Sequence, residues 1–178
     1  MNKDTKTIFK VFTAWQDDRE EVWLRDMARQ GWHLVKPGVG KYVFRRGEPQ
    51  DVVYRLDYYS LWNNDEKQTY YDLFEQSGWE LVGELVGWQY FRKPARAGEA
   101  DEIYTDSESK IKKHTRVIIL FGILLLMMGL NLINIGHMQF DSEVGRAAVT
   151  GLLSLAAVLD GYALLRTWLR VRALQSLP

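Results

Sequence analysis

Two copies of one short pattern, Gly31-Trp32-His33-Leu34-Val35 and Gly78-Trp79-Glu80-Leu81-Val82, decide how this chain folds. The copies lie 47 positions apart, from 31 to 78, and the same shift aligns further residues without a gap. It places Trp15 on Trp62, Val39-Gly40 on Val86-Gly87, and Phe44-Arg45 on Phe91-Arg92. A repeat of this period indicates a duplicated supersecondary unit.

Each copy has the hydrophobic periodicity of a strand, a helix and two further strands. Apolar residues alternate around Phe9 and around Leu56, which predicts an opening strand in each copy. Acidic residues precede each predicted helix, and Gly31 or Gly78 ends it. The closing strands are predicted at residues 32–36, 41–46, 79–84 and 87–93. Residues 1–93 are therefore predicted to form an α+β domain, a tandem strand-helix-strand-strand repeat with one sheet, a pseudo-twofold axis and both helices on one face.

The second half of the chain has the composition of membrane-spanning helices. Residues 117–135 carry no charged side chain, and residues 147–165 carry only Asp160. About 20 helical residues cross a hydrocarbon core of about 30 Å. We therefore expect residues 110–178 to form a two-helix transmembrane hairpin with basic flanks, in contact with the lipid bilayer.

The charges around these segments predict how the hairpin is oriented. Basic residues precede the first segment and follow the second, whereas the short loop between them carries Asp141, Glu143 and a single arginine, Arg146. The positive-inside rule then predicts a cell-membrane protein with two spans and both termini in the cytoplasm. The start of the chain lacks an apolar stretch, so no cleavable signal peptide is expected. The flanking cations are Lys110, Lys112, Lys113 and Arg116 on one side, and Arg166, Arg170 and Arg172 on the other.

Three polar residues interrupt the apolar segments, at Asn131, Asn134 and Asp160. Asp160 either fixes helix pairing or senses protons, or it lies about one turn from the interface near Arg166. Asn131 and Asn134 are expected at the outer end of the first helix, where they would hold helices together within the hairpin or between copies. Transport would require an oligomer, because two helices are too thin to enclose a pore.

Residues 94–109 connect the two parts and are predicted to contain a linker and a helix cap. Residues 94–100 have the composition of a flexible linker, and Thr105 and Glu108 have the spacing of a capping box. The helix that begins there is either a rigid lever between the domain and the membrane or an ordinary capped helix with cations at the lipid surface.

Composition and motif searches argue against several classes of protein. The chain has no cysteine, so thiolate metal sites and disulfides are excluded, and its net charge of zero argues against direct nucleic-acid binding. Its histidines, His33, His114 and His137, do not have the spacing of metal ligands. Nucleotide-binding and hydrolase motifs are missing from the sequence. We expect neither a cofactor nor enzymatic activity.

Several elements of the repeat and of the segment after it resemble one bacterial family. They are Trp23-Leu24, Gly31-Trp32, Tyr54-Arg55-Leu56-Asp57-Tyr58, Gly78-Trp79-Glu80, Tyr90-Phe91-Arg92 and Ile103-Tyr104-Thr105-Asp106, followed by the expected hairpin. Over residues 8–113 the chain resembles the family catalogued as domain of unknown function 2812. This resemblance implies a Gram-positive-type membrane protein, often encoded beside a PadR-like transcription regulator, and no known catalytic residues. The repeat layout is also similar to GyrI-like small-molecule-binding modules, as an analogy of fold.

Strand alternation predicts which residues lie on the sheet face away from the helices. Phe9 and Val11 are expected to face the helices. The open face is expected to hold Phe12, Arg55, Asp57, Tyr59, Trp88 and Tyr90. Aromatic rings with arginine are typical of binding surfaces, although the same rings could simply form cross-strand pairs in the sheet.

Three functions are consistent with these features. The first is a membrane-anchored regulatory module that docks a protein partner, or a second copy, through the open aromatic face. The second is a small-molecule sensor that binds an apolar or cationic ligand in the groove between the repeats, with Asp57 as counter-ion. The third is a subunit of an oligomeric channel or transporter. A concave groove lined by these rings would favour a small ligand, and a flat face would favour a protein.

Overall fold

The computed structural model describes residues 4–59, 64–96, 107–140 and 142–175. The chain divides into two compact units, Met1–Ser109 and Lys110–Pro178. Most of the expected connector, including Thr105 of the predicted capping box, lies outside the described residues.

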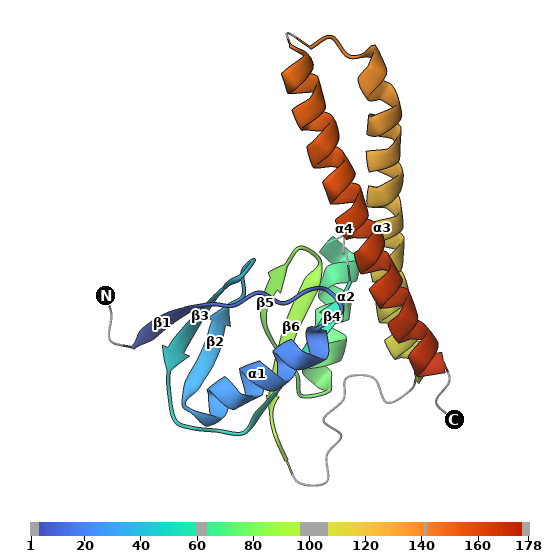
Figure 1. Ribbon diagram of the computed structural model, residues 1–178. Coiled ribbons are helices and arrows are strands. Elements are labelled where there is room, and N and C mark those ends of the chain that lie inside the picture. Colours follow the sequence, from blue (N-terminus) through green and yellow to red (C-terminus); the bar gives the residue numbers. More distant parts are fainter. Residues whose placement is uncertain (1–3, 60–63, 97–106, 141, 176–178) are drawn as a thin grey trace. The chain divides into compact units, whose positions relative to one another are not determined.

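The first unit has the element order that the repeat predicts, which confirms an α+β fold (Figure 1). The helices end at Gly31 and Gly78, whose φ angles of 78° and 80° are left-handed and favour glycine. The first copy contains β1 (Thr5–Phe9), α1 (Asp17–Arg29), β2 (Trp32–Lys36) and β3 (Lys41–Arg46). The second copy contains β4 (Val52–Tyr58), α2 (Asn64–Gln76), β5 (Glu80–Leu85) and β6 (Trp88–Pro94).

The strands form two three-stranded antiparallel sheets, ordered β1-β3-β2 and β4-β6-β5, where the sequence predicted one. The edge strands β2 and β5 lie side by side, but no ladder joins them. Each has a register shift at the same repeat position, between Leu34 and Lys36 and between Leu81 and Gly83. Bulges of this kind bend an edge and interrupt pairing. Pro37, which has no N–H to donate, packs so close to Gly83 that a Cβ there would lie 2.9 Å from its Cδ.

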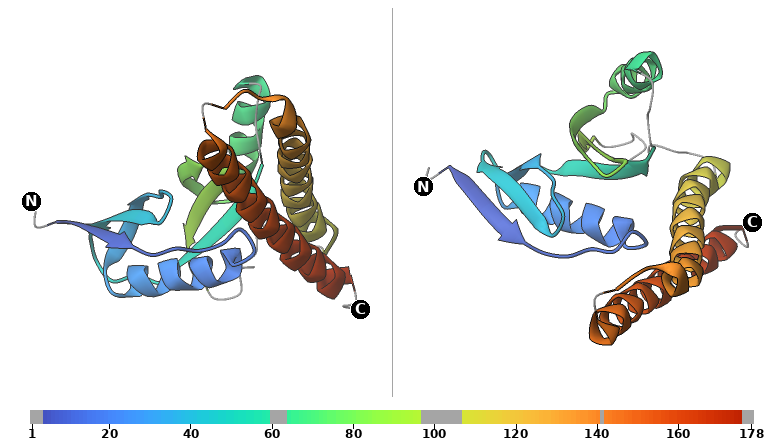
Figure 2. Two further views of the ribbon diagram at one scale, coloured as in Figure 1. Left: turned by 45° about the horizontal axis from the view of Figure 1, so that its top comes forward. Right: turned by 90° about the horizontal axis from the view of Figure 1, so that it is seen from above.

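The two helices cover opposite faces of the second sheet, so the prediction that both lie on one face is wrong. Tyr54 and Leu56 belong to a core cluster with Leu24 of α1, whereas Val53 and Phe91 belong to a second cluster with Phe74 of α2. Successive strand residues point to opposite faces, so α1 and α2 lie on opposite sides of this sheet. Seen from above, the blue α1 and the green α2 flank the teal β4 (Figure 2, right).

Helix α1 packs on both sheets because it carries anchoring groups on two sides. Glu20 accepts hydrogen bonds from Tyr42 of β3 and Tyr90 of β6, and Glu21 accepts the backbone N–H of Leu56 in β4. The equivalent positions in α2 are Lys67 and Gln68, which contact Glu84 and Asp72 within the second copy. The two helices therefore make different contacts, since α1 bonds to both copies and these α2 residues bond within the second copy.

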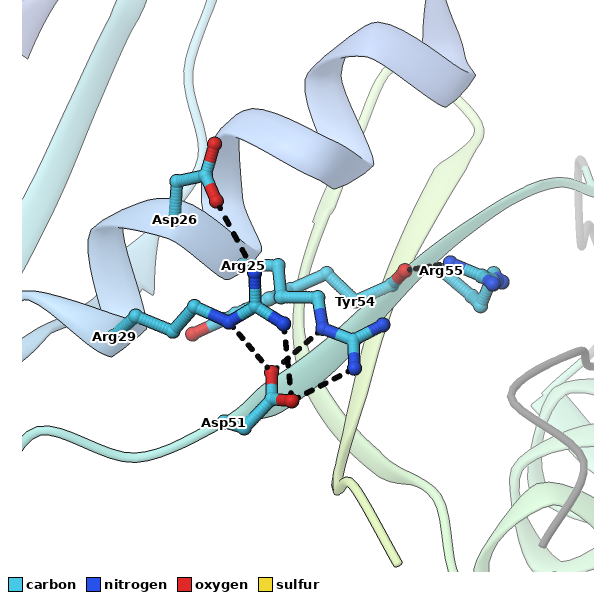
Figure 3. Close-up of polar contacts among 6 residues, drawn as sticks. All are labelled: Arg25, Asp26, Arg29, Asp51, Tyr54 and Arg55. Atoms are coloured by element: carbon cyan, nitrogen blue, oxygen red, sulfur yellow. Dashed lines mark hydrogen bonds and ion pairs between the residues drawn. The ribbon is translucent and has the colours of Figure 1, made fainter. Parts of the chain in front are cut away.

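A second link between α1 and the second copy is an arginine clamp on Asp51, just before β4 (Figure 3). Arg25 donates from Nε to Oδ1 at 2.6 Å and from Nη2 to Oδ2 at 2.8 Å. Arg29 makes the same pair of bonds at 3.0 and 3.1 Å. The guanidinium groups hold the pKa of the Asp51 carboxyl well below its ordinary range.

The second unit contains α3 (Ser107–Asn134), a short 3-10 turn η1 (Ile135–His137) and α4 (Glu143–Gln175). Both long helices are long and apolar enough to cross a membrane, over Ile111–His137 and Glu143–Ala173. The core helix of a soluble protein is mostly buried, whereas the most apolar window of α3 is 0% buried and that of α4 is 11% buried. Exposure of this extent is what lipid-facing helices have.

Candidate functional site

The predicted site residues of the first unit do not share an open sheet face. Asp57 and Tyr90 are buried, with 0% and 3% of their surface exposed, and Phe12, Arg55, Tyr59 and Trp88 are half-buried. The prediction fails because a helix covers each face of the second sheet. Tyr70 of α2 donates to Asp57 Oδ2 at 2.7 Å, and α1 covers the side on which Tyr90 lies.

The structure separates these six residues into two groups. Arg55 donates to Glu21 Oε2 at 3.2 Å, and Tyr59 stacks on Tyr70 with ring centroids 5.0 Å apart, so both belong to the packing around β4. Asp57 lies with them and cannot serve as the counter-ion of a groove ligand. Phe12, Trp88 and Tyr90, by contrast, line one concave pocket.

This pocket has a volume of about 290 Å³ and is built from both copies of the repeat. Its walls are the segment between β1 and α1, the first turn of α1, the β2–β3 turn, β3, β4 and the β5–β6 hairpin. The lining residues are Val11, Phe12, Thr13, Ala14, Asp17, Glu20, Gly38, Val39, Gly40, Tyr42, Leu56, Leu85, Val86, Trp88 and Tyr90. We call it the inter-repeat pocket.

Two carboxylates from α1 give this pocket an acidic lining. Glu20 is 5% exposed, and its Oε1 accepts the hydroxyl groups of Tyr42 at 2.7 Å and Tyr90 at 2.8 Å. Burial raises the pKa of the Glu20 carboxyl, the two tyrosine hydrogen bonds partly oppose this, and the charge of Asp17 raises it further. Burial next to Glu20 likewise raises the pKa of both tyrosines. Asp17, one turn earlier, is 2% exposed.

Neither lysine nor arginine is among the described residues that line the pocket. Lys10 contacts the pocket residue Phe12 from outside the lining, with its Nζ 5.0 Å from the ring of Phe12 and 4.6 Å from that of Trp23. The lining therefore carries negative charge only, within walls that are largely apolar. A positively charged group would be stabilised there by both features.

Aromatic rings and exposed valines form the rest of the pocket. Trp88 packs edge-on against Tyr58 at 5.4 Å, and Phe12 packs against Tyr42 at 6.3 Å. Val11, Val39 and Val86 are among the exposed large apolar residues, and all three line the pocket. Phe9 and Val11, predicted to face the helices, are exposed instead: Phe9 ends the outer strand of its sheet, and Val11 lies beyond that strand.

Sequence reasoning missed the carboxylates of this pocket. The sequence pattern identifies Asp17 only as one of the acidic residues at the start of a helix, and it does not single out Glu20. One signal was available, because Glu20 lies at helical spacing with Leu24, Met27 and Ala28, all of which are buried. A carboxylate within the apolar stripe of a helix indicates a buried polar contact or a binding site.

The polar residues of the second unit are not brought together by hydrogen bonds among the described residues. Asn131 and Asn134 are exposed, and Asn131 donates to the carbonyl of Met127 in its own helix at 2.8 Å. Asp160 is buried in α4. Their role between copies, in self-association or a channel, stays a prediction. Within the described residues no three His, Asp or Glu side chains are grouped to hold a metal ion.

The fold defines a class of protein, a tandem α+β domain followed by two helices that are long and apolar enough to span a membrane. Comparison with protein families identifies the family to which the chain belongs. The family described as "Protein of unknown function (DUF2812)" matches residues 16–126, which is more than half of the chain, and the chain belongs to it. No curated protein and no solved structure matches the chain.

Proposed function

We propose that this protein is a membrane-anchored binding module for a small apolar cation, which it holds in the inter-repeat pocket. The observation that carries the proposal is a concave pocket that Phe12, Trp88 and Tyr90 line together with the carboxylates Asp17 and Glu20. A concave site favours a small ligand over a docked protein. Docking of a protein would require the open aromatic face, and α1 and α2 cover the two faces of the second sheet.

The chemistry of the lining defines the ligand class. Apolar walls exclude water and strengthen the attraction between a carboxylate and a cation. Aromatic rings add cation–π attraction, which is strongest for Trp and for poorly hydrated cations such as quaternary ammonium groups. A neutral apolar molecule would be stabilised only by burial of its apolar surface. An anion would be repelled by Asp17 and Glu20.

The pocket volume limits the ligand to a small molecule. Ligand pockets range from about 300 to 1,000 Å³, and this pocket, at about 290 Å³, lies at the small end of that range. We therefore propose a ligand about as large as one aromatic ring with one ammonium group.

We further propose that the protein lies in the cell membrane with both termini in the cytoplasm. The basic residues flanking the two apolar helices support this orientation under the positive-inside rule. Arg172 lies over Trp168 with its guanidinium carbon 4.3 Å from the ring centroid, a pairing suited to the membrane interface. The first unit, which contains the inter-repeat pocket, would then be in contact with cytoplasmic solutes.

Calorimetric titration of the full-length protein in phosphatidylcholine nanodiscs tests the binding proposal. The probe is benzyltrimethylammonium, and benzenesulfonate is its anionic counterpart. We expect saturable binding of the cation alone. Asp17→Asn should weaken it by roughly tenfold, as expected for loss of one ionic contact. Asp18→Asn is the matched control, because Asp18 is the exposed neighbour in the same helical turn.

A second pair of variants tests the aromatic wall. Trp88→Ala should weaken binding of the probe, whereas Trp32→Ala should not, since both tryptophans pack on the first core but only Trp88 lines the pocket. Equal affinity for the cation and the anion, or equal effects of the paired variants, would contradict the proposed function.

A further inference from the structure

A second and larger cleft lies at the other end of the two hairpins. Its volume is about 640 Å³, and the residues lining it come from β2, β3, β5, β6 and the segments that join them. The inter-repeat pocket takes its lining from the β2–β3 and β5–β6 turns, whereas this cleft takes it from the opposite strand ends. None of the residues that line one site lines the other, so the two sites are separate.

The lining of the second cleft is made largely of residues at equivalent repeat positions. The 47-residue shift relates His33 to Glu80, Leu34 to Leu81, Val35 to Val82, Arg45 to Arg92 and Arg46 to Lys93, and all of these line it. The duplication has therefore brought two pairs of cations to one cleft. We call it the basic cleft.

The charge of the basic cleft is strongly positive, in contrast to the neutral chain. Its charged lining residues are four cations, Arg45, Arg46, Arg92 and Lys93, and one carboxylate, Glu80. Leu34 and Val52 are buried in its floor and lower the local polarity. Cations next to an apolar floor attract an anion more strongly than cations surrounded by water do.

The two copies differ in how the equivalent arginines are neutralised. Across the strands, Glu80 faces Arg92 and binds it through two hydrogen bonds, at 2.9 and 2.7 Å. In the first copy the cross-strand partner of Arg45 is His33, whose Nε2 contacts the carbonyl of Glu48 at 2.8 Å. Among residues 4–59 and 64–96, the Arg45 side chain forms neither an ion pair nor a hydrogen bond.

Aromatic rings contact two other cations of the cleft. Arg46 donates to the carbonyl of Gln30 at 3.0 Å, and its guanidinium carbon lies 5.0 Å from the ring of Trp32. Lys93 Nζ lies 4.6 Å from the ring of Trp79. The contacts of Arg46 position its side chain and leave its positive charge in place.

We propose that the basic cleft binds a small soluble molecule that carries a phosphate or diphosphate group. Guanidinium groups match the geometry of phosphate oxygens and bind them through paired hydrogen bonds. The cleft volume is that of a ligand of ordinary metabolite size. Arg45 is the principal anion contact, because Glu80 binds Arg92 whereas the cross-strand partner of Arg45 is His33, which is not a carboxylate.

The test is calorimetric titration of the full-length protein in phosphatidylcholine nanodiscs with inorganic pyrophosphate, at constant ionic strength. We expect saturable binding that Arg45→Gln weakens by roughly tenfold. Arg19→Gln is the matched control, because Arg19 is exposed and does not line the cleft. Arg45 is exposed, so its substitution should leave the fold intact, which the unfolding midpoint of the variant verifies.

A gain-of-function variant makes the test independent of folding defects. Glu80→Gln removes the carboxylate that neutralises Arg92 and should tighten pyrophosphate binding several-fold. Absence of saturable binding, or equal weakening by Arg45→Gln and Arg19→Gln, would overturn the proposal. If nanodiscs with phosphatidylglycerol abolish pyrophosphate binding through Arg45, the ligand is a lipid headgroup and the choice of a soluble molecule is wrong.

Discussion

Glu20 connects the core of the first unit to the inter-repeat pocket. One carboxylate oxygen accepts hydroxyl groups from β3 and from β6, so the residue joins the two sheets while it lines the pocket. Burial raises the pKa of this carboxyl, which means that the folded protein takes up a proton more readily than the unfolded chain does.

The pH dependence of stability should therefore respond to Glu20→Gln. With a folded pKa above the unfolded one, the stabilising contribution is complete below the unfolded pKa and is lost as pH rises through the folded pKa. We expect the wild-type unfolding midpoint to fall relative to that of Glu20→Gln as pH rises from acid to neutral. Thermal unfolding of both proteins in nanodiscs, followed by tryptophan fluorescence, measures this.

Glu20→Ala is the contrasting variant. It leaves two buried tyrosine hydroxyls without their acceptor, which should cost about 2 kcal/mol across the same pH range. A Glu20→Gln protein whose midpoint tracks that of the wild type at every pH would contradict the raised pKa.

Val86 is held in a backbone conformation that suits other residues better. Its φ of 49° is left-handed, and with Gly87 at 82° it forms a two-residue turn of type I′, in which asparagine is favoured. Val86→Asn should stabilise the first unit by about 1 kcal/mol. Val39→Asn, at the equivalent repeat position, should not, since among the described residues Val86 alone combines a side chain with positive φ. Chemical denaturation of both variants checks this difference.

At the scale of elements, α1 determines how the two copies pack. Its clamp on Asp51 depends on a carboxyl whose pKa is held below its ordinary range by two arginines. Asp51→Asn should cost about 1 kcal/mol near neutral pH, a modest value because the clamp is partly exposed.

Acid should remove this difference. A lowered folded pKa gives stability that is present above the unfolded pKa, near 4, and is lost as pH falls below it. The wild type and Asp51→Asn should therefore converge in stability in acid. Asp26→Asn serves as control, since Asp26 Oδ1 lies 3.5 Å from Arg29 Nη1 and forms a longer and more exposed ion pair than the clamp. A constant gap down to low pH would show that the clamp acts through something other than ionisation.

The elements themselves could be predicted from the repeat and from periodicity, and their packing could not. Gly31 and Gly78 end their helices as expected, and both strand pairs lie where alternation placed them. Alternation also put Tyr90 and Asp57 on the same side as Phe12, yet it cannot tell which face of a sheet a distant helix will cover. That choice depends on the long-range contacts of Glu20, Glu21 and the Asp51 clamp, whose partners cannot be identified from the local sequence pattern.

At the scale of the whole molecule, the proposed topology can be tested because the chain has no cysteine. A single cysteine introduced by Ser142→Cys, between the two spans, should react with a membrane-impermeant maleimide on intact cells. Gln175→Cys, near the end of α4, should react only after the cells are permeabilised. Labelling in the reverse pattern would contradict cytoplasmic termini.

The central claim is that an apolar cation occupies the inter-repeat pocket, and fluorine NMR measures occupancy there most directly. The full-length protein is labelled with 5-fluorotryptophan, and the Trp88 and Trp79 signals are assigned with Trp→Phe variants. On titration with benzyltrimethylammonium the Trp88 signal should shift saturably and the Trp79 signal, from the second core, should not. A Trp88 signal that does not move, or that moves only as much as that of Trp79, would contradict the account.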